Sequence, residues 1–228
     1  MNFSEAFSWV NIQFLLEGLL TTVQVAFYSI IFSIILGFIL GFIRYFEIPI
    51  VSKVVGWIVD IIRNLPLLLI IFFTYFALPQ MGVSLDVFWS TVAALTIFEA
   101  SMISEILRGG LKAIPEGQTE AGLASGLSRT NVMRHILLPQ AFRDTLPSVV
   151  SQLIALLKDT SLATIITLPE LTHNAKIIYG QDTSYVIPMF IALAFFYFVI
   201  CFALSIFSKY LAKTITFRTT EIQSQVSN

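Results

Sequence analysis

Apolar runs long enough to cross a lipid bilayer recur along this chain of 228 residues, and they constrain its fold more than any other feature. A membrane-spanning helix needs about 20 mostly apolar residues. Hydrophobic residues make up 57% of the chain and charged residues 12%, about half the charged share of a soluble domain. A soluble domain of this size would need more polar surface to cover its core. The sequence therefore predicts an all-α integral membrane protein.

Five segments of the chain are long enough to form such helices. Their predicted bounds are residues 19–43, 54–78, 87–107, 146–168 and 186–207. The last segment carries no charge, whereas the second, third and fourth contain ionisable side chains. We therefore expect five transmembrane helices, with a long polar loop over residues 111–143 between the third and the fourth.

Lysine and arginine are distributed unevenly between the connections, and positive residues favour the cytoplasmic side of a membrane. The connections 44–53, 108–145 and 209–228 carry ten of these residues, whereas 1–18, 79–86 and 169–185 carry one, Lys176. This asymmetry predicts a multi-pass protein of the bacterial cell membrane. We expect an outer N-terminal segment over residues 1–18 and a cytoplasmic tail over residues 209–228.

The polar loop contains the stretch EAGLASGLSRTNVMRHILLP at residues 120–139, which reads as two short helices. Pro115 suits the first position of one helix, and Gly126 suits a left-handed cap at its end. Ser128 can cap a second helix, which we expect Pro139 to end. Small residues on the first helix would let its backbone enter the groove of a partner. An interfacial hairpin without a partner is the alternative.

The same stretch resembles the EAA loop of ABC-transporter permease subunits. The residues that match its spacing are Glu120, Ala121, Gly126, Ile136, Leu138 and Pro139. Gly122 departs from the pattern, which usually has a second alanine there. RNLPLLLIIFF (63–73), SEILRGGLKAIPEGQ (104–118), LLPQAFRDTLP (137–147) and LLKDTSL (156–162) look like the polar amino-acid uptake branch of that family. The resemblance covers nearly the whole chain, in order.

The resemblance implies a set of partners and a division of labour among them. The coupling loop would dock onto an ATP-hydrolysing subunit through Glu120, Ala121, Gly122 and Gly126. A pair of identical ATP-binding subunits, a second permease that is identical or similar, and an extracytoplasmic amino-acid-binding protein would complete the assembly. ATP and Mg would bind the partner ATPase, because the phosphate cradle needs a Gly-Lys pair that this chain lacks. We therefore expect neither a cofactor nor enzymatic activity in this chain.

Ionisable residues inside membrane spans are costly and mark functional sites by default. The candidates for the substrate path are Arg63, Glu99, Lys158 and Asp159. Arg63 could instead pair with Asp60, three residues earlier on the same helix. Glu99 and Asp159 could instead pair internally with Lys158 or Arg63. Both alternatives stay open at the level of the sequence.

Other residues have simpler interpretations. Glu105 and Arg108 are spaced for a salt bridge at the entrance to the loop. Gly37 and Gly41 would allow close helix packing, either within this chain or with a second subunit. The two histidines are too far apart in the expected topology to form a metal site. A net charge of −1 gives no sign of nucleic-acid binding, and no catalytic set converges.

The sequence thus predicts the membrane-spanning permease subunit of an ATP-driven importer for polar amino acids. The stretches FEASMISE (98–105) and DTSL look most like permeases for glutamate, aspartate or glutamine. A permease for cationic amino acids is the alternative substrate class. An ATP-independent secondary transporter, whose loop would be only an interfacial hairpin, is the alternative mechanism.

Overall fold

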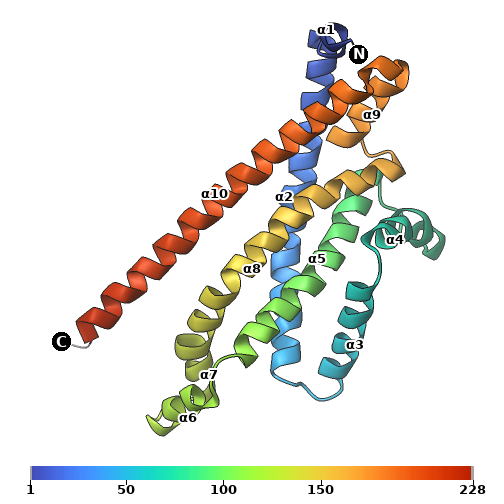
Figure 1. Ribbon diagram of the computed structural model, residues 1–228. Coiled ribbons are helices and arrows are strands. Elements are labelled where there is room, and N and C mark those ends of the chain that lie inside the picture. Colours follow the sequence, from blue (N-terminus) through green and yellow to red (C-terminus); the bar gives the residue numbers. More distant parts are fainter. Residues whose placement is uncertain (1, 227–228) are drawn as a thin grey trace.

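The computed structural model describes residues 2–226, without the side chains of residues 207–209 and 211–226. Within this range the chain is helical and has no β-strand (Figure 1). The α-helices are α1 (Phe3–Ala6), α2 (Trp9–Tyr45), α3 (Val51–Asn64), α4 (Leu67–Phe72), α5 (Val87–Lys112), α6 (Glu116–Ala124), α7 (Arg129–Val132), α8 (Leu138–Asp159), α9 (Leu171–Gln181) and α10 (Val186–Val226). Short π and 3-10 turns extend α4, precede and follow α8, and precede α10.

The predicted membrane spans are present, with different bounds. Four spans are long, apolar stretches of helix, namely Trp9–Tyr45, Val87–Lys112, Arg129–Ile166 and Thr183–Ile206. At the place of the predicted second span lies a bent pair of helices, Val51–Asn64 and Leu67–Met81, with the geometry of a broken span or a re-entrant loop. The first span, α2, begins ten residues before its predicted start at residue 19, because hydrophobic side chains continue back to Trp9. The predicted tail from residue 209 continues α10 as far as Val226, and residues 227–228 lie outside the described range.

The second span is not the single helix over residues 54–78 that the sequence suggested. Its two halves meet at an angle of 107°. Leu65 has extended backbone angles, φ −91° and ψ 143°, and Pro66 follows it. Proline disfavours the helical conformation at the residue before it and lacks the N–H that would continue the hydrogen-bond ladder. The chain therefore turns sharply at this point.

Small residues let α2 pack closely along α5, which is the most extensive helix pair in the protein. A Cβ atom added to Gly37 would lie 2.8 Å from Ile103, and one added to Gly41 would lie 3.0 Å from Leu107. Both partners are on α5. The interpretation of these glycines as packing residues within the chain is therefore confirmed.

The connection between the fourth and fifth predicted spans is fixed to α2 by polar contacts. The hydroxyl of Thr22 accepts a hydrogen bond from the backbone N–H of Leu171, and the Asn174 amide donates to the carbonyl of Phe14. Glu170 is fully buried and caps α9 by accepting from the backbone N–H groups of Thr172 and His173. Burial raises the pKa of the Glu170 carboxyl from an ordinary 4.5 to about 7, although these hydrogen bonds favour its charged form. The end of the molecule that carries α9 therefore contains a buried carboxyl group whose pKa is raised by its burial.

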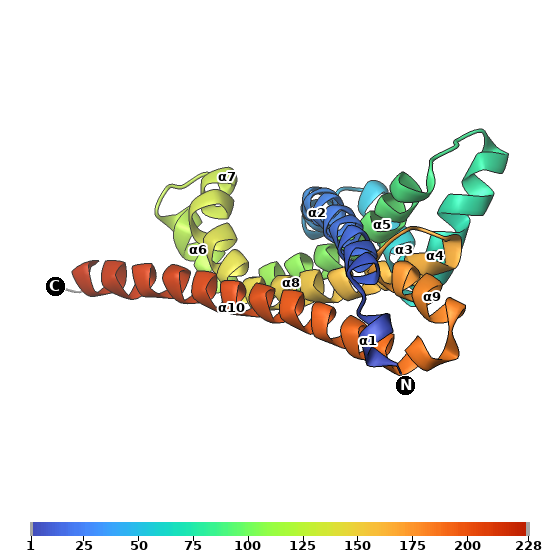
Figure 2. The same ribbon diagram turned by 90° about the horizontal axis from the view of Figure 1, so that it is seen from above.

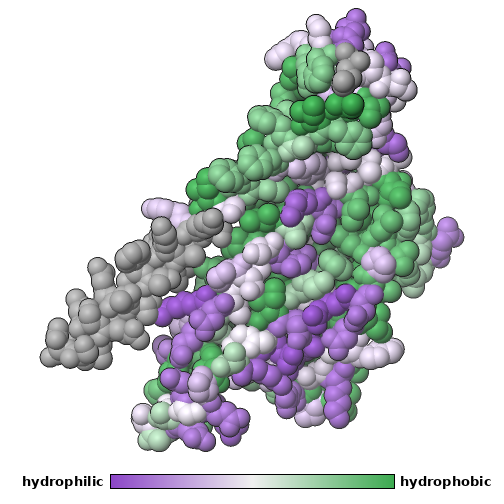
Figure 3. Space-filling model, in the orientation of Figure 1, coloured by the Kyte–Doolittle hydropathy of each residue, from purple (hydrophilic) through white to green (hydrophobic). Residues whose placement is uncertain are grey.

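The two ends of the molecule differ in character. The N-terminus and α9 lie at one end, and α6 and α7 lie at the other (Figure 1). Seen from above, α6 and α7 project to one side of α8 and stand apart from α3 and α4 (Figure 2). Hydrophobic side chains cover most of the N-terminal half of the face in Figure 3, and hydrophilic side chains gather towards the end that carries α6.

Candidate functional site

The polar loop folds as two short helices joined by a tight turn. Gly126 has a φ of 83°, in the left-handed region that glycine adopts without strain. The hydroxyl of Ser128 caps α7 by accepting from the backbone N–H of Asn131 at 3.3 Å. Both capping predictions are confirmed. Pro115 precedes α6 as its N-cap and is not the first helical residue.

Pro139 does not end a helix, contrary to the prediction from the sequence. It lies in the first turn of α8, directly after the π-helical turn Met133–Leu137. A proline is tolerated in a first turn, where its missing N–H would have no regular helical partner. The loop therefore returns without a break into the fourth span, and any movement of α7 reaches α8 directly.

The predicted docking residues divide into an exposed group and a buried one. Glu120, Ala121 and Gly126 are exposed. Gly122 is buried, and a Cβ atom there would lie 2.8 Å from Val132 and 2.9 Å from Ile136. Gly122 therefore does not lie on the surface open to a partner. It holds α6 against the returning chain, which explains why a small residue is needed at this position.

Glu99 is a buried carboxyl group in the middle of α5. Its residue is 1% exposed, and one oxygen accepts a long hydrogen bond of 3.5 Å from the side-chain amide of Gln152 on α8. The other oxygen, Oε1, is buried and has no hydrogen-bond partner. A buried acceptor without a donor is costly. This oxygen is therefore a candidate contact for a ligand.

Asp159 is the last residue of α8, about two helical turns after Gln152. Lys158 is exposed, and no ion pair in the described part of the chain joins it to either carboxyl group. Within the described residues, neither Glu99 nor Asp159 therefore forms an ion pair with Lys158 or Arg63. Glu99, Lys158 and Asp159 lie on the adjoining helices α5 and α8, whereas Arg63 lies at the end of α3.

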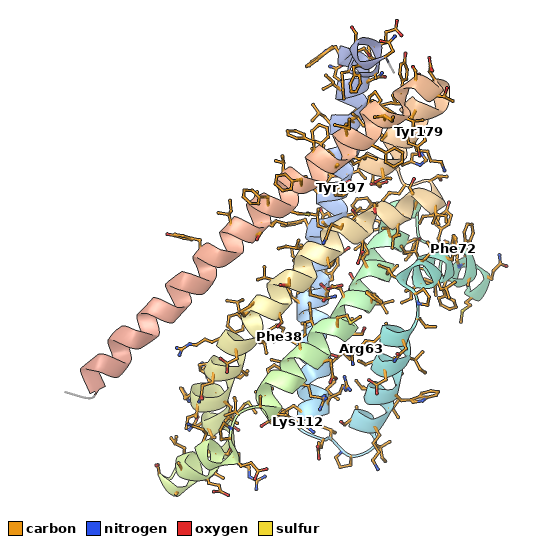
Figure 4. All side chains as sticks on the ribbon, in the orientation of Figure 1. Phe38, Arg63, Phe72, Lys112, Tyr179 and Tyr197 are labelled. Atoms are coloured by element: carbon orange, nitrogen blue, oxygen red, sulfur yellow. The ribbon has the colours of Figure 1, made fainter. Side chains whose placement is uncertain are left out.

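Arg63 belongs to an ionic cluster between α2, α3 and α5, where Figure 4 labels it. Its Nη1 atom lies 3.8 Å from both Asp60 and Glu105. The expected pairing with Asp60 is thus present, but it is shared with Glu105. Glu105 also pairs with Arg108, as its spacing predicted.

Arg44 is the member of this cluster that the sequence analysis missed. Its side chain is 10% exposed, and it lies 2.8 Å from Glu105 and 3.5 Å from Asp60. Arg44 was assigned to a cytoplasmic connection, but α2 extends to Tyr45 and carries it alongside α5. Its position at the end of a long apolar run was the only available signal.

Comparison with known proteins places this arrangement in a family. Residues 33–217 match the family described as "Binding-protein-dependent transport system inner membrane component". The chain belongs to this family. Its permease fold is similar to a solved structure described as an amino acid ABC transporter with histidines, with a TM-score of 0.82, 27% identity, and coverage of 89% of this chain and 94% of that one.

Curated relatives narrow the assignment. The permease is 51% identical to the probable glutamine ABC transporter permease protein GlnP of Bacillus subtilis, over 92% of this chain and 97% of the relative. It is 32% identical to the arginine transport system permease protein ArtQ of the same organism, over 92% and 95%. An inward-facing structure of the MetNI methionine ABC transporter shares the fold, with a TM-score of 0.76, 20% identity, and coverage of 92% and 99%. The chain is a multi-pass membrane permease subunit of an ABC amino-acid importer. Membership implies ATPase partners and a second permease.

Proposed function

We propose that this permease imports a polar amino acid of the glutamine type and is driven by ATP that binds to a separate pair of identical ATPase subunits. The N-terminus faces outward, the loop Glu116–Ser128 faces the cytoplasm, and an external binding protein delivers the substrate. ATP and Mg act on the partner, and this chain supplies the path and the coupling element. The name of the relative with 51% identity supports the substrate class.

The exposed turn after α6 is the observation that carries this proposal. Glu120 and Ala121 in α6 and Gly126 in the turn after it are exposed, and α6 lies at the end opposite the N-terminus (Figure 1). Leu123 and Leu127 beside them are 38% and 37% exposed, so the tip combines apolar and polar contacts, as transient interfaces do. A loop that served only to connect two spans would not need this surface.

The loop can transmit movement because both of its ends continue into spans. Ala113 separates α5 from the turn before α6, and α7 leads through its π turn into α8. Movement of a docked ATPase would tilt α5 against α8. Glu99 and Gln152 lie on these two helices, so such a tilt would change the distance between them.

The pair Glu99 and Gln152 supports a substrate with both an ammonium group and a side-chain amide. The unpartnered Oε1 of Glu99 can accept from an ammonium group, and the Gln152 amide can pair with another amide. Glu99 and Asp159 form no ion pair within the described residues, and two acidic groups on adjoining helices favour a second candidate substrate, a cationic amino acid. The relative named for arginine transport supports that alternative.

Two glycines with the same backbone conformation provide a test of coupling. Gly126 and Gly82 have φ values of 83° and 86°, and neither has an atom within 4 Å of an added Cβ. Valine at either position costs similar strain, about 1–2 kcal/mol. We expect Gly126→Val to abolish ATP-driven uptake and weaken co-purification with the ATPase, and Gly82→Val to preserve both. Gly126→Asn, which tolerates the left-handed region, should retain most of the activity.

Equal effects of the two valine substitutions would show that strain alone causes the loss. Full uptake by Gly126→Val, with no requirement for ATP, would instead support an ATP-independent transporter. In that case the loop would be an interfacial hairpin with no coupling role.

A further inference from the structure

A cavity of about 650 Å³ opens at the elbow between α2 and α3, and nothing in the proposed transport cycle uses it. Charged and apolar side chains both line it, and we refer to Arg44, Asp60 and Arg108, together with Gly56, as its floor. Lys53 and Trp57 line its wall. We call this cavity the elbow pocket. It lies at the same end of the molecule as Lys112 and α6 (Figures 1 and 4).

The charges in and around the elbow pocket do not balance. Five basic and three acidic side chains lie in this region, so its net charge is +2. The basic side chains are Arg44, Lys53, Arg63, Arg108 and Lys112, and the acidic ones are Glu47, Asp60 and Glu105. Among the described side chains, Lys53 is the basic member with no ion pair. The surplus favours an anionic ligand.

Two buried guanidinium nitrogens in the same cluster make no hydrogen bond, although both arginines are ion-paired and Arg63 does not itself line the elbow pocket. They are Nη1 of Arg44 and Nε of Arg63. Nη1 of Arg44 lies 2.8 Å from Glu105, but the alignment of the two groups is not that of a hydrogen bond. The Arg44 side chain is nine-tenths buried and lines the elbow pocket. Arginine donors of this kind suit phosphate oxygens.

The rim of the elbow pocket is apolar and open. Trp57 is 70% exposed and Ile50 is 77% exposed. The outer face of α3 continues this surface with Val54, Ile58 and Ile61, all exposed. Tryptophan is enriched at the interface between membrane and water. A ligand that fits both the charged floor and this apolar rim has an anionic head and hydrocarbon chains.

We propose that the elbow pocket binds the headgroup of an anionic phospholipid, with the acyl chains along the outer face of α3. Basic pockets between membrane helices on the cytoplasmic side suit such headgroups. The lipid would hold the α2–α3 elbow against the membrane while α5 moves. The assignment of this lipid to the cytoplasmic leaflet rests on the proposed orientation of the protein. The binding of the lipid to the elbow pocket does not depend on that orientation.

The test uses the intact transporter complex in nanodiscs that contain brominated phosphatidylglycerol or brominated phosphatidylcholine. Both leaflets then have the same composition, so the result does not depend on orientation. Quenching of Trp57 is the difference in fluorescence between the complex and its Trp57→Phe variant. We expect phosphatidylglycerol to reach half-maximal quenching at a lower mole fraction than phosphatidylcholine does.

Variants separate specific binding from ordinary contact with lipid. Lys53→Ala should weaken the preference for phosphatidylglycerol over phosphatidylcholine about fivefold, because that is the contribution of one cation near an anionic surface. Gly56→Ala should keep it, because the added Cβ meets only Arg44 Nε, at 3.7 Å. Gly56→Phe should fill the floor and abolish it. Lys176→Ala, at an exposed lysine in the outer connection, should leave it unchanged.

Three results would overturn the proposal. Equal quenching by the two lipids would show that Trp57 meets only bulk lipid. Protection of Trp57 by inorganic phosphate, without a preference between lipids, would identify a site for a soluble anion. Absence of quenching by either lipid would show that a partner subunit covers the elbow pocket.

Discussion

Replacing Gly37 by alanine should destabilise the protein through a single close contact between α2 and α5. The added Cβ would lie 2.8 Å from the Cβ and Cγ2 atoms of Ile103 and 3.0 Å from the backbone oxygen of Ala100. Carbon atoms normally approach to about 3.5–4.0 Å. Rotation of the Ile103 side chain cannot relieve the clash, because the positions of its Cβ and of the Ala100 oxygen are fixed by the backbone of α5. The two helices must therefore separate.

The magnitude follows from two opposing effects. Overpacking of this kind costs about 1–3 kcal/mol. Alanine regains about 1 kcal/mol as the better helix former. We expect a net loss of up to about 2 kcal/mol in the free energy of unfolding. Gly41→Ala should cost less, because its nearest contact at 3.0 Å is the flexible end of Leu107.

Unfolding of the purified protein by a denaturing detergent, followed by circular dichroism, measures this loss. Gly109→Ala is the matched control, since this helical glycine of α5 has nothing within 4 Å of an added Cβ. The control should be neutral or slightly stabilising. Equal stability of the Gly37 and Gly109 variants would refute the packing argument.

Three further substitutions test the buried charges. Glu99→Ala should lower uptake at least about tenfold without loss of assembly, because a lost charged hydrogen bond to substrate costs about 1.5–3 kcal/mol. The control Glu17→Ala, at an exposed position, should not change uptake. Arg44→Ala breaks a buried ion pair and should lower the free energy of unfolding by about 3 kcal/mol. Lys112→Ala breaks an exposed pair and should lower it by at most about 1 kcal/mol, so similar losses from the two variants would contradict the argument from burial. The raised pKa of Glu170 means that the folded state binds more protons than the unfolded state, so stability should fall as pH rises from 4.5 to about 7. Thermal stability measured across this range should depend less on pH in Glu170→Gln, and an unchanged dependence would exclude Glu170 as its source.

The number of spans could be predicted from the sequence because hydrophobic length alone determines which segments can cross a bilayer. Capping by Gly126 and Ser128 was predictable for a similar reason, since local backbone chemistry determines both. The sharp bend after Leu65 could have been expected from Pro66, but tolerated kinks in membrane helices made a continuous span equally reasonable. The angle depends on packing that no local signal reports.

The grouping of the charged residues could not be predicted, because it depends on which faces of distant helices meet. Arg63 and Glu99 both lie inside predicted spans, yet one joins an ionic cluster and the other faces Gln152. Gly122 shows the same limit. Its small size suggested an exposed docking surface, but the return of the chain through Val132 and Ile136 buries it. Small residues favour close approach without specifying the partner.

The most direct test of the account is uptake of radiolabelled glutamine by proteoliposomes that contain the complete transporter, with ATP supplied on the side of the loop Glu116–Ser128. The account predicts uptake that requires hydrolysable ATP and the external binding protein, and that stops when a non-hydrolysable analogue replaces ATP. Equal uptake without ATP, driven by an ion or substrate gradient, would contradict it.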